Sequence, residues 1–194
     1  MAVYWYAWVL VICVYFFMKN TRTRTALLFF LYFLMCSFSW KIISPSVYLY
    51  AHLILLILFG LYFISFQKRP LVVYLWLFFL SIGHASGSLF ILIHPVWMHL
   101  PGFSTGFVLV LLLRMILTDF RGLAGLWLFI NGAGMTLTYV VLRFYGKEGV
   151  VTAQPLLVFV LKGLLILLFV HGLRVLKKNN AGAGKSKQKG DAYA

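Results

Sequence analysis

Long apolar runs separated by short gaps are the feature that most constrains this chain of 194 residues. A helix needs about 20 apolar residues to cross the hydrocarbon core of a bilayer, with a range of about 17–25. We predict seven spanning helices, which gives an all-α, polytopic transmembrane helix bundle. The predicted spans are Ala2–Met18, Ala26–Ile43, Val47–Phe66, Leu71–Ile93, Phe103–Thr118, Leu123–Leu142 and Pro155–Leu176.

The apolar runs fit helices and do not fit the strands of a membrane barrel. Backbone groups in lipid must be satisfied internally, so only helices and closed barrels can span a bilayer. Barrel strands alternate apolar and polar residues over about ten positions, whereas Leu53–Leu58 and Leu164–Val170 are continuously apolar. Prolines fall only between the runs or at their starts, where a missing N–H is tolerated.

Composition excludes a soluble protein and argues against nucleic acid as a partner. The chain is 63% hydrophobic and 10% charged, against about 45–50% and about 25% in soluble domains. The net charge of +14 would suggest nucleic-acid binding in a soluble chain. Because the basic residues lie mostly in short gaps between spans and in the tail, they indicate topology and attraction to anionic lipid headgroups instead.

The gaps between spans alternate between rich and poor in Lys and Arg, which predicts the orientation. Only Lys41, Arg143 and Lys147 fall in the poor set of gaps, and Lys162 lies inside a span. Positively charged loops stay in the cytoplasm, so we predict an N-terminus outside, a C-terminus inside and a protein of the cell (cytoplasmic) membrane. The basic set comprises Lys19, Arg22, Arg24, Lys68, Arg69, Arg114, Arg121, Arg174, Lys177, Lys178, Lys185, Lys187 and Lys189.

Two regions follow from this pattern. Residues 1–176 form the predicted transmembrane helical domain. Residues 177–194 consist mainly of Gly, Ala, Lys, Asn and Gln, a composition that cannot bury a core. We therefore expect this segment to be a disordered, basic, cytoplasmic tail that contacts anionic headgroups together with the basic loops.

Four polar residues inside the spans are the candidate ligand-binding residues: Lys162, His84, His52 and Asn131. Polar and ionisable side chains are expensive to bury in a bilayer and commonly mark functional sites. On the predicted topology all four lie in the outer half of the membrane, where they could line one polar cavity. The alternative is that Lys162 extends to the interface and the other three bond between helices as packing contacts.

Small residues in the fourth span predict close helix packing, within the chain or between chains. Gly83 and Gly87 are spaced as a GxxxG pair, which lets two helix backbones approach closely. No acidic residue lies deep in a span, and no Cys/His metal spacing occurs. We therefore expect neither an enzyme nor a bound cofactor or metal.

Two functions stay open. The first is a non-enzymatic interaction or assembly protein that binds another membrane protein, or a second copy of itself, through its small-residue faces. The alternative is a small-solute carrier or substrate-binding membrane subunit that uses the polar residues of the outer half.

The N-terminal segment resembles one known family. Tyr4-Trp5-Tyr6-Ala7-Trp8, followed by Phe16-Phe17-Met18-Lys19 and Arg22, is similar to the opening of YphA-like proteins. These are small membrane proteins of Bacillus-type bacteria. The resemblance covers about the first 25 residues together with the overall length and hydropathy. It implies a bacterial membrane protein, and it brings no activity or functional residue with it.

Overall fold

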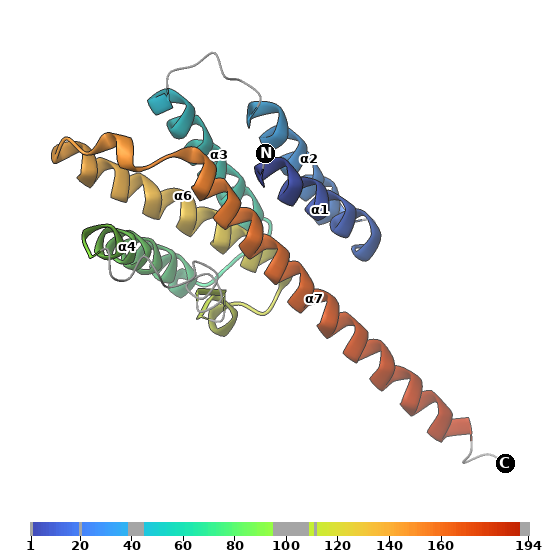
Figure 1. Cartoon of the computed structure of the whole chain (residues 1–194). Helices are drawn as coiled ribbons and strands as arrows, with labels where there is room; N and C mark the ends of the chain where they lie inside the picture. Colours follow the sequence, from blue (N-terminus) through green and yellow to red (C-terminus); the bar gives the residue numbers. More distant parts are fainter. Residues whose placement is uncertain (1, 20, 39–44, 95–108, 111, 191–194) are drawn as a thin grey trace.

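The computed structural model describes residues 2–19, 21–38, 45–94, 109–110 and 112–190, with backbone alone at 45, 148 and 178–190. Every regular element in these ranges is helical, which confirms the predicted all-α class for this part of the chain. Residues 109–110 and 112–116 are also helical. The elements are α1 (Ala2–Phe17), α2 (Arg22–Phe38), α3 (Pro45–Ser65), α4 (Leu71–Ile93), α6 (Phe120–Phe144), the 3-10 turn η2 (Glu148–Val150) and α7 (Ala153–Gly190) (Figure 1).

Helix α6 is the centre of the bundle and packs antiparallel to α3. Gly60 of α3 faces the backbone of Phe129, and Gly132 of α6 faces Ile57, so that a Cβ added at either glycine would lie 2.7–2.9 Å from a neighbouring atom. Nearer the end of α6, Tyr139 stacks edge-on against Tyr50, with ring centroids 5.0 Å apart. Small residues allow these two backbones to approach closely, as is typical of membrane helices.

Helix α4 packs on another side of α6 and runs parallel to it (Figure 1). Near the start of both helices, Arg69 bonds Asp119. Farther along, Gly134 of α6 faces the backbone of Ser81, and the Thr138 hydroxyl lies 3.5 Å from the carbonyl of Ala85. Since the residue numbers rise together on the two helices, both begin at the same end of the bundle.

Helices α7 and α2 pack as antiparallel neighbours on α6 and α3, respectively. Helix α7 packs on α6, where the indole Nε1 of Trp127 donates a 2.9 Å hydrogen bond to the carbonyl of Val160. Helix α2 packs on α3 through Phe30 and Phe59, whose ring centroids are 5.0 Å apart. Helix α1 packs between α2 and α7. The described core is built mostly of Leu, Val, Phe and Ala side chains from these helices.

Four helical segments are long and apolar enough to cross a bilayer: Ser46–Ser65, Leu71–Ile93, Phe120–Phe144 and Ala153–Lys177. Helix α1 is apolar but has only 16 residues, and α2 has 17 residues with two arginines in its first turn. At 1.5 Å per residue such helices are about 25 Å long, slightly short of a hydrocarbon core of about 30 Å. The described fold is therefore that of a membrane protein with several spanning helices.

The structure changes several predicted boundaries: α2 begins at Arg22, four residues before the predicted span, and α6 and α7 differ as well. Helix α6 begins at Phe120, three residues before the predicted span, because the Asp119 carboxylate caps it by accepting a 2.8 Å hydrogen bond from the Gly122 N–H. Helix α7 continues to Gly190, into the segment predicted as a disordered tail. This segment contains no proline, and Ala, Lys and Gln favour helix. Residues 103–108 and 111 of the predicted fifth span, Phe103–Thr118, and the last residues of the tail, 191–194, lie outside the described residues.

Candidate functional site

The four predicted binding residues lie in three different places. His52 is buried between α2 and α3, with 1% of its surface exposed. Its Nδ1 lies 2.8 Å from the carbonyl oxygen of Tyr48, and its Nε2 lies 3.2 Å from the hydroxyl of Ser37. Because a carbonyl oxygen only accepts, Nδ1 carries a proton and donates. His52 therefore links α2 to α3, which is the packing role weighed for it above.

His84 and Asn131 belong to a second cluster, between α4, α6 and α7. The His84 ring stacks on Phe159 of α7, with centroids 6.3 Å apart, and its side chain lies against Gly134. Asn131 is fully buried, and its Nδ2 donates a 2.8 Å hydrogen bond to the carbonyl of Trp127. The rings of Trp127 and Phe159, 5.4 Å apart, connect the surroundings of the two polar residues.

Two polar atoms of this cluster stand out. His84 Nε2 and Asn131 Oδ1 are both buried, and neither has a hydrogen-bond partner among the described residues. An unpaired buried polar group costs about 1–3 kcal/mol. Such atoms in a membrane core are therefore the natural contacts for a water molecule or a small polar ligand.

Lys162 lies apart from both histidines. Its side chain is exposed on α7, and its Nζ lies 5.4 Å from the centroid of the Tyr6 ring on α1. This geometry is that of a cation over an aromatic face at the surface of the helix bundle. It corrects the expectation of one shared cavity: His52 bonds within the α2–α3 contact, Lys162 faces outward, and His84 and Asn131 lie in the interior.

The two glycines of the GxxxG pair lie on the exposed side of α4. A Cβ added at Gly83 or Gly87 would meet no atom of the described residues within 4 Å. The side of α4 that packs on α6 instead carries Ser81 and Ala85. In the described part of the chain the pair therefore makes no packing contact, and a contact with another protein stays a prediction.

An ion pair at one end of the bundle was not predicted from the sequence. Arg69 Nη2 lies 2.6 Å from Asp119 Oδ2, and the two side chains are 11% and 32% exposed. The nearby Arg174 Nη1 donates to the carbonyl of Thr118, which brings α7 to the same end. The sequence did contain a signal for this ion pair. Arg69 precedes one predicted span and Asp119 precedes another, and Asp119 is the sole carboxylate in the predicted cytoplasmic loops between spans.

The pKa of the Asp119 carboxyl reflects competing effects. Partial burial on its own raises this pKa, because it disfavours the charged form. The hydrogen bonds from Arg69 and from the Gly122 N–H, together with the positive charge of Arg69, outweigh burial and leave the pKa below its usual value. Asp119 is therefore a carboxylate at neutral pH.

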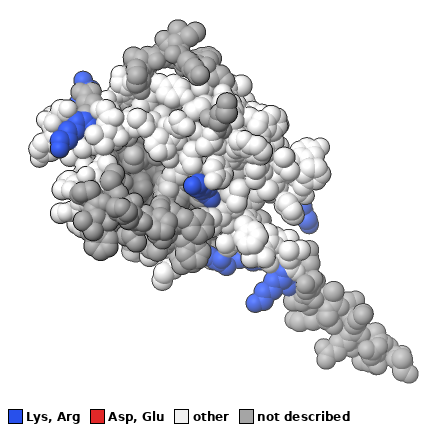
Figure 2. All heavy atoms as spheres, viewed as in Figure 1, with Lys and Arg blue, Asp and Glu red and all other residues white. Residues whose placement is uncertain are grey.

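Charge elsewhere on the described surface is basic. On the face shown in Figure 2 the charged side chains in view are blue, and some of them lie where α7 leaves the body of the bundle. Arg69–Asp119 is the single salt bridge within the described ranges. Nor do three His, Cys, Asp or Glu side chains of these ranges come together in a group that could hold a metal ion.

Fold and site together define an integral membrane protein built of helices, with a buried polar pair and a basic end. The model of the YphA-like integral membrane protein family matches residues 1–192. The chain therefore belongs to this family, as the N-terminal resemblance suggested. Neither the curated proteins nor the solved structures yield a match.

Proposed function

We propose that the protein crosses the cytoplasmic membrane seven times, with its N-terminus outside. The parallel packing of α4 and α6 supports this topology. Helix α4 ends at Ile93, far from the end at which α6 begins at Phe120. A connection that returns along the pair would add a seventh crossing to those that we propose for the six described helices. The excess of Lys and Arg at the Arg69 end assigns that end to the cytoplasm.

Within this topology, the protein is a non-enzymatic assembly protein that binds another membrane helix through the exposed side of α4. The observation that carries this proposal is the contrast between two sets of glycines. Gly60, Gly125 and Gly132 are closely packed within the chain, whereas Gly83 and Gly87 face open space among the described residues. In the most apolar stretch of α4 only 17% of residues are buried, against 61% in α6.

Lipid alone gives no advantage to a paired glycine surface, because small residues stabilise a membrane helix mainly where another backbone approaches. A second helix laid across Gly83 and Gly87 would gain that close contact. The partner is therefore expected to be a transmembrane helix, contributed either by another protein or by a second copy of this chain.

The test is co-purification of the full chain from membranes after cross-linking. Gly87→Leu should remove the partner while leaving expression and the melting temperature unchanged. Gly172→Leu is the matched control, because Gly172 also lies in a helix and also has no described atom within 4 Å of an added Cβ. Retention of the partner by Gly87→Leu, or equal loss in both variants, would reject the α4 interface.

A second candidate function is a small-solute carrier or substrate-binding subunit. It is supported by the unpaired His84 Nε2 and Asn131 Oδ1 in the membrane interior. A solute with both a donor and an acceptor could satisfy the two atoms together. This candidate uses His84 and Asn131 alone among the four predicted residues, because the ring nitrogens of His52 already have partners and Lys162 is exposed.

A thermal-shift screen of the purified chain against small polar metabolites tests this candidate. A ligand of this site should raise the melting temperature of the wild type and of Lys162→Leu, and should not stabilise Asn131→Leu or His84→Leu. A ligand that stabilises all four proteins equally binds elsewhere, and a screen in which nothing binds favours the assembly function.

A further inference from the structure

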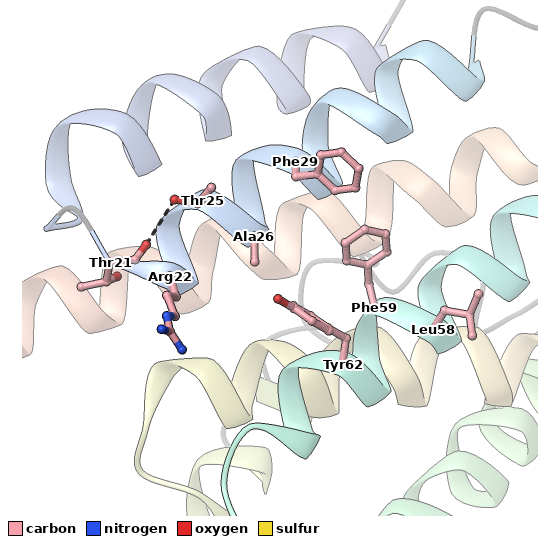
Figure 3. A pocket seen from close by; sticks show the side chains of 8 residues that line it. All are labelled: Thr21, Arg22, Thr25, Ala26, Phe29, Leu58, Phe59 and Tyr62. Atoms are coloured by element: carbon pink, nitrogen blue, oxygen red, sulfur yellow. Dashed lines mark hydrogen bonds between the residues drawn. The ribbon is translucent and has the colours of Figure 1, made fainter.

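A groove of about 840 Å³ lies between α2 and α3. Figure 3 shows its lining side chains, and the Arg22 side chain extends from α2 toward the neighbouring helices. The groove lies at the basic end of the bundle, since Arg22 acts electrostatically on Arg121 beside Asp119. Its lining consists of Thr21, Arg22, Thr25, Ala26, Phe29, Leu58, Phe59 and Tyr62.

The groove is polar at one end and apolar at the other. Thr21, Arg22 and Thr25 lie at the start of α2, whereas Phe29 lies about 10 Å farther along the helix than Arg22, at 1.5 Å per residue. On α3, Leu58 likewise lies one turn farther from the basic end than Tyr62. The change from hydroxyl and guanidinium groups to aromatic and aliphatic ones matches the change from headgroup to acyl chain in a phospholipid.

The apolar part of the groove is accessible from the surrounding lipid. Phe29 is 63% exposed and Leu58 is 59% exposed, so both side chains present a face that the described chain leaves uncovered. The ring of Phe59 closes the floor between the helices by packing on Phe29 and Phe30. A lipid chain could therefore enter sideways from the bilayer without any movement of the helices.

The polar end carries positive charge that no carboxylate of the described side chains matches. Among those side chains the acidic group nearby is Asp119, which is engaged by Arg69. Arg121 lies with its guanidinium carbon 3.2 Å from the centroid of the Phe66 ring, and its Nε and Nη2 are buried without a partner among the described residues. An anion beside Arg22 would reduce the electrostatic repulsion between these two arginines.

We propose that this groove binds one anionic phospholipid of the cytoplasmic leaflet. The phosphate lies at Arg22, with the hydroxyl group of Thr21 as an additional donor. One acyl chain lies along Phe29, Leu58 and Phe59. This is a defined site for a single lipid, in addition to the general attraction between basic loops and an anionic membrane surface. It is independent of the interface proposed on α4.

Native mass spectrometry of the full chain tests the site, with phosphatidylglycerol and phosphatidylcholine of identical acyl chains as the two probes. We expect one phosphatidylglycerol to be retained more strongly than phosphatidylcholine. Arg22→Gln should weaken retention about fivefold, the effect of one basic residue at an anionic surface. The control is Arg24→Gln, because Arg24 belongs to the same helix, lies over the Tyr15 ring and does not line the groove.

A second pair of variants tests the acyl-chain part of the site. Leu58→Trp should fill the groove and reduce retention, whereas Leu61→Trp, an exposed position outside the lining, should leave it unchanged. Equal losses in Arg22→Gln and Arg24→Gln would overturn the proposal in favour of a diffuse electrostatic attraction. Displacement of the lipid by inorganic phosphate, with no effect of Leu58→Trp, would overturn it in favour of a simple anion site.

Discussion

Arg69 and Asp119 join the segment before α4 to the N-terminal cap of α6 through a 2.6 Å contact between Nη2 and Oδ2. The same carboxylate oxygen accepts a hydrogen bond from the Gly122 N–H, so one side chain both caps α6 and holds α4 beside it. This contact fixes the common starting level of two parallel helices.

Loss of the Asp119 charge should destabilise the protein while preserving the cap, since Asn is also a good N-cap residue. Asp119→Asn is expected to cost about 2 kcal/mol, the range of hydrogen bonds to charged groups, because it leaves the 11%-exposed Arg69 without its partner. Unfolding in detergent monitored by intrinsic fluorescence measures this loss. Combining it with Arg69→Gln should cost clearly less than the sum of the two single changes. Additive losses would mean that the contact contributes nothing.

Stability should depend on pH through the same carboxyl group. Because the folded-state pKa of Asp119 is lowered, its contribution is fully present above the unfolded-state pKa of about 3.9 and is lost as the pH falls through the folded-state pKa. The difference in melting temperature between wild type and Asp119→Asn should thus stay constant from pH 7 to pH 5 and shrink below about pH 4. A difference that already shrinks near pH 6 would contradict this assignment.

Gly163 should tolerate no side chain. A Cβ at this position would collide with the Trp127 indole, whose Nε1 bonds the carbonyl of Val160. Gly163→Ala is expected to cost about 1–3 kcal/mol, as overpacking does elsewhere, and to change the tryptophan emission. Gly172→Ala, on the same helix but facing open space among the described residues, should be close to neutral in the same assay. Equal behaviour of the two variants would contradict the observed α6–α7 packing.

Hydropathy predicted the positions of the helices in the sequence more accurately than it predicted which helices pack together. The predicted span Leu71–Ile93 coincides with α4, and the span predicted from Ala2 ends one residue beyond α1. The start of α6 was placed too late because Arg121 interrupts the apolar run, although Asp119 offered a capping signal. The parallel pairing of α4 with α6 has no such signature, because core-facing and lipid-facing positions are equally apolar in a membrane protein.

For the candidate site, the sequence predicted the depth of each residue in the membrane but not the side of the helix on which it lies. Counting residues from the ends of the spans placed His52, His84, Asn131 and Lys162 at related depths. It gave no information on the side of the helix that each residue occupies, and the structure directs them to three different surroundings. The α2–α3 groove could not be predicted either, since it depends on how Phe29, Phe59 and Tyr62 pack across two helices.

The most direct test of the topology is cysteine accessibility at the two ends of the connection between α4 and α6. In a Cys13→Ser/Cys36→Ser background, single cysteines replace His94 and Thr118, both of which are exposed. Seven crossings predict that a membrane-impermeant maleimide labels position 94 in intact cells and position 118 only after permeabilisation. Labelling of both positions from the same side would show that the chain does not cross between them, and would contradict the seven-span account.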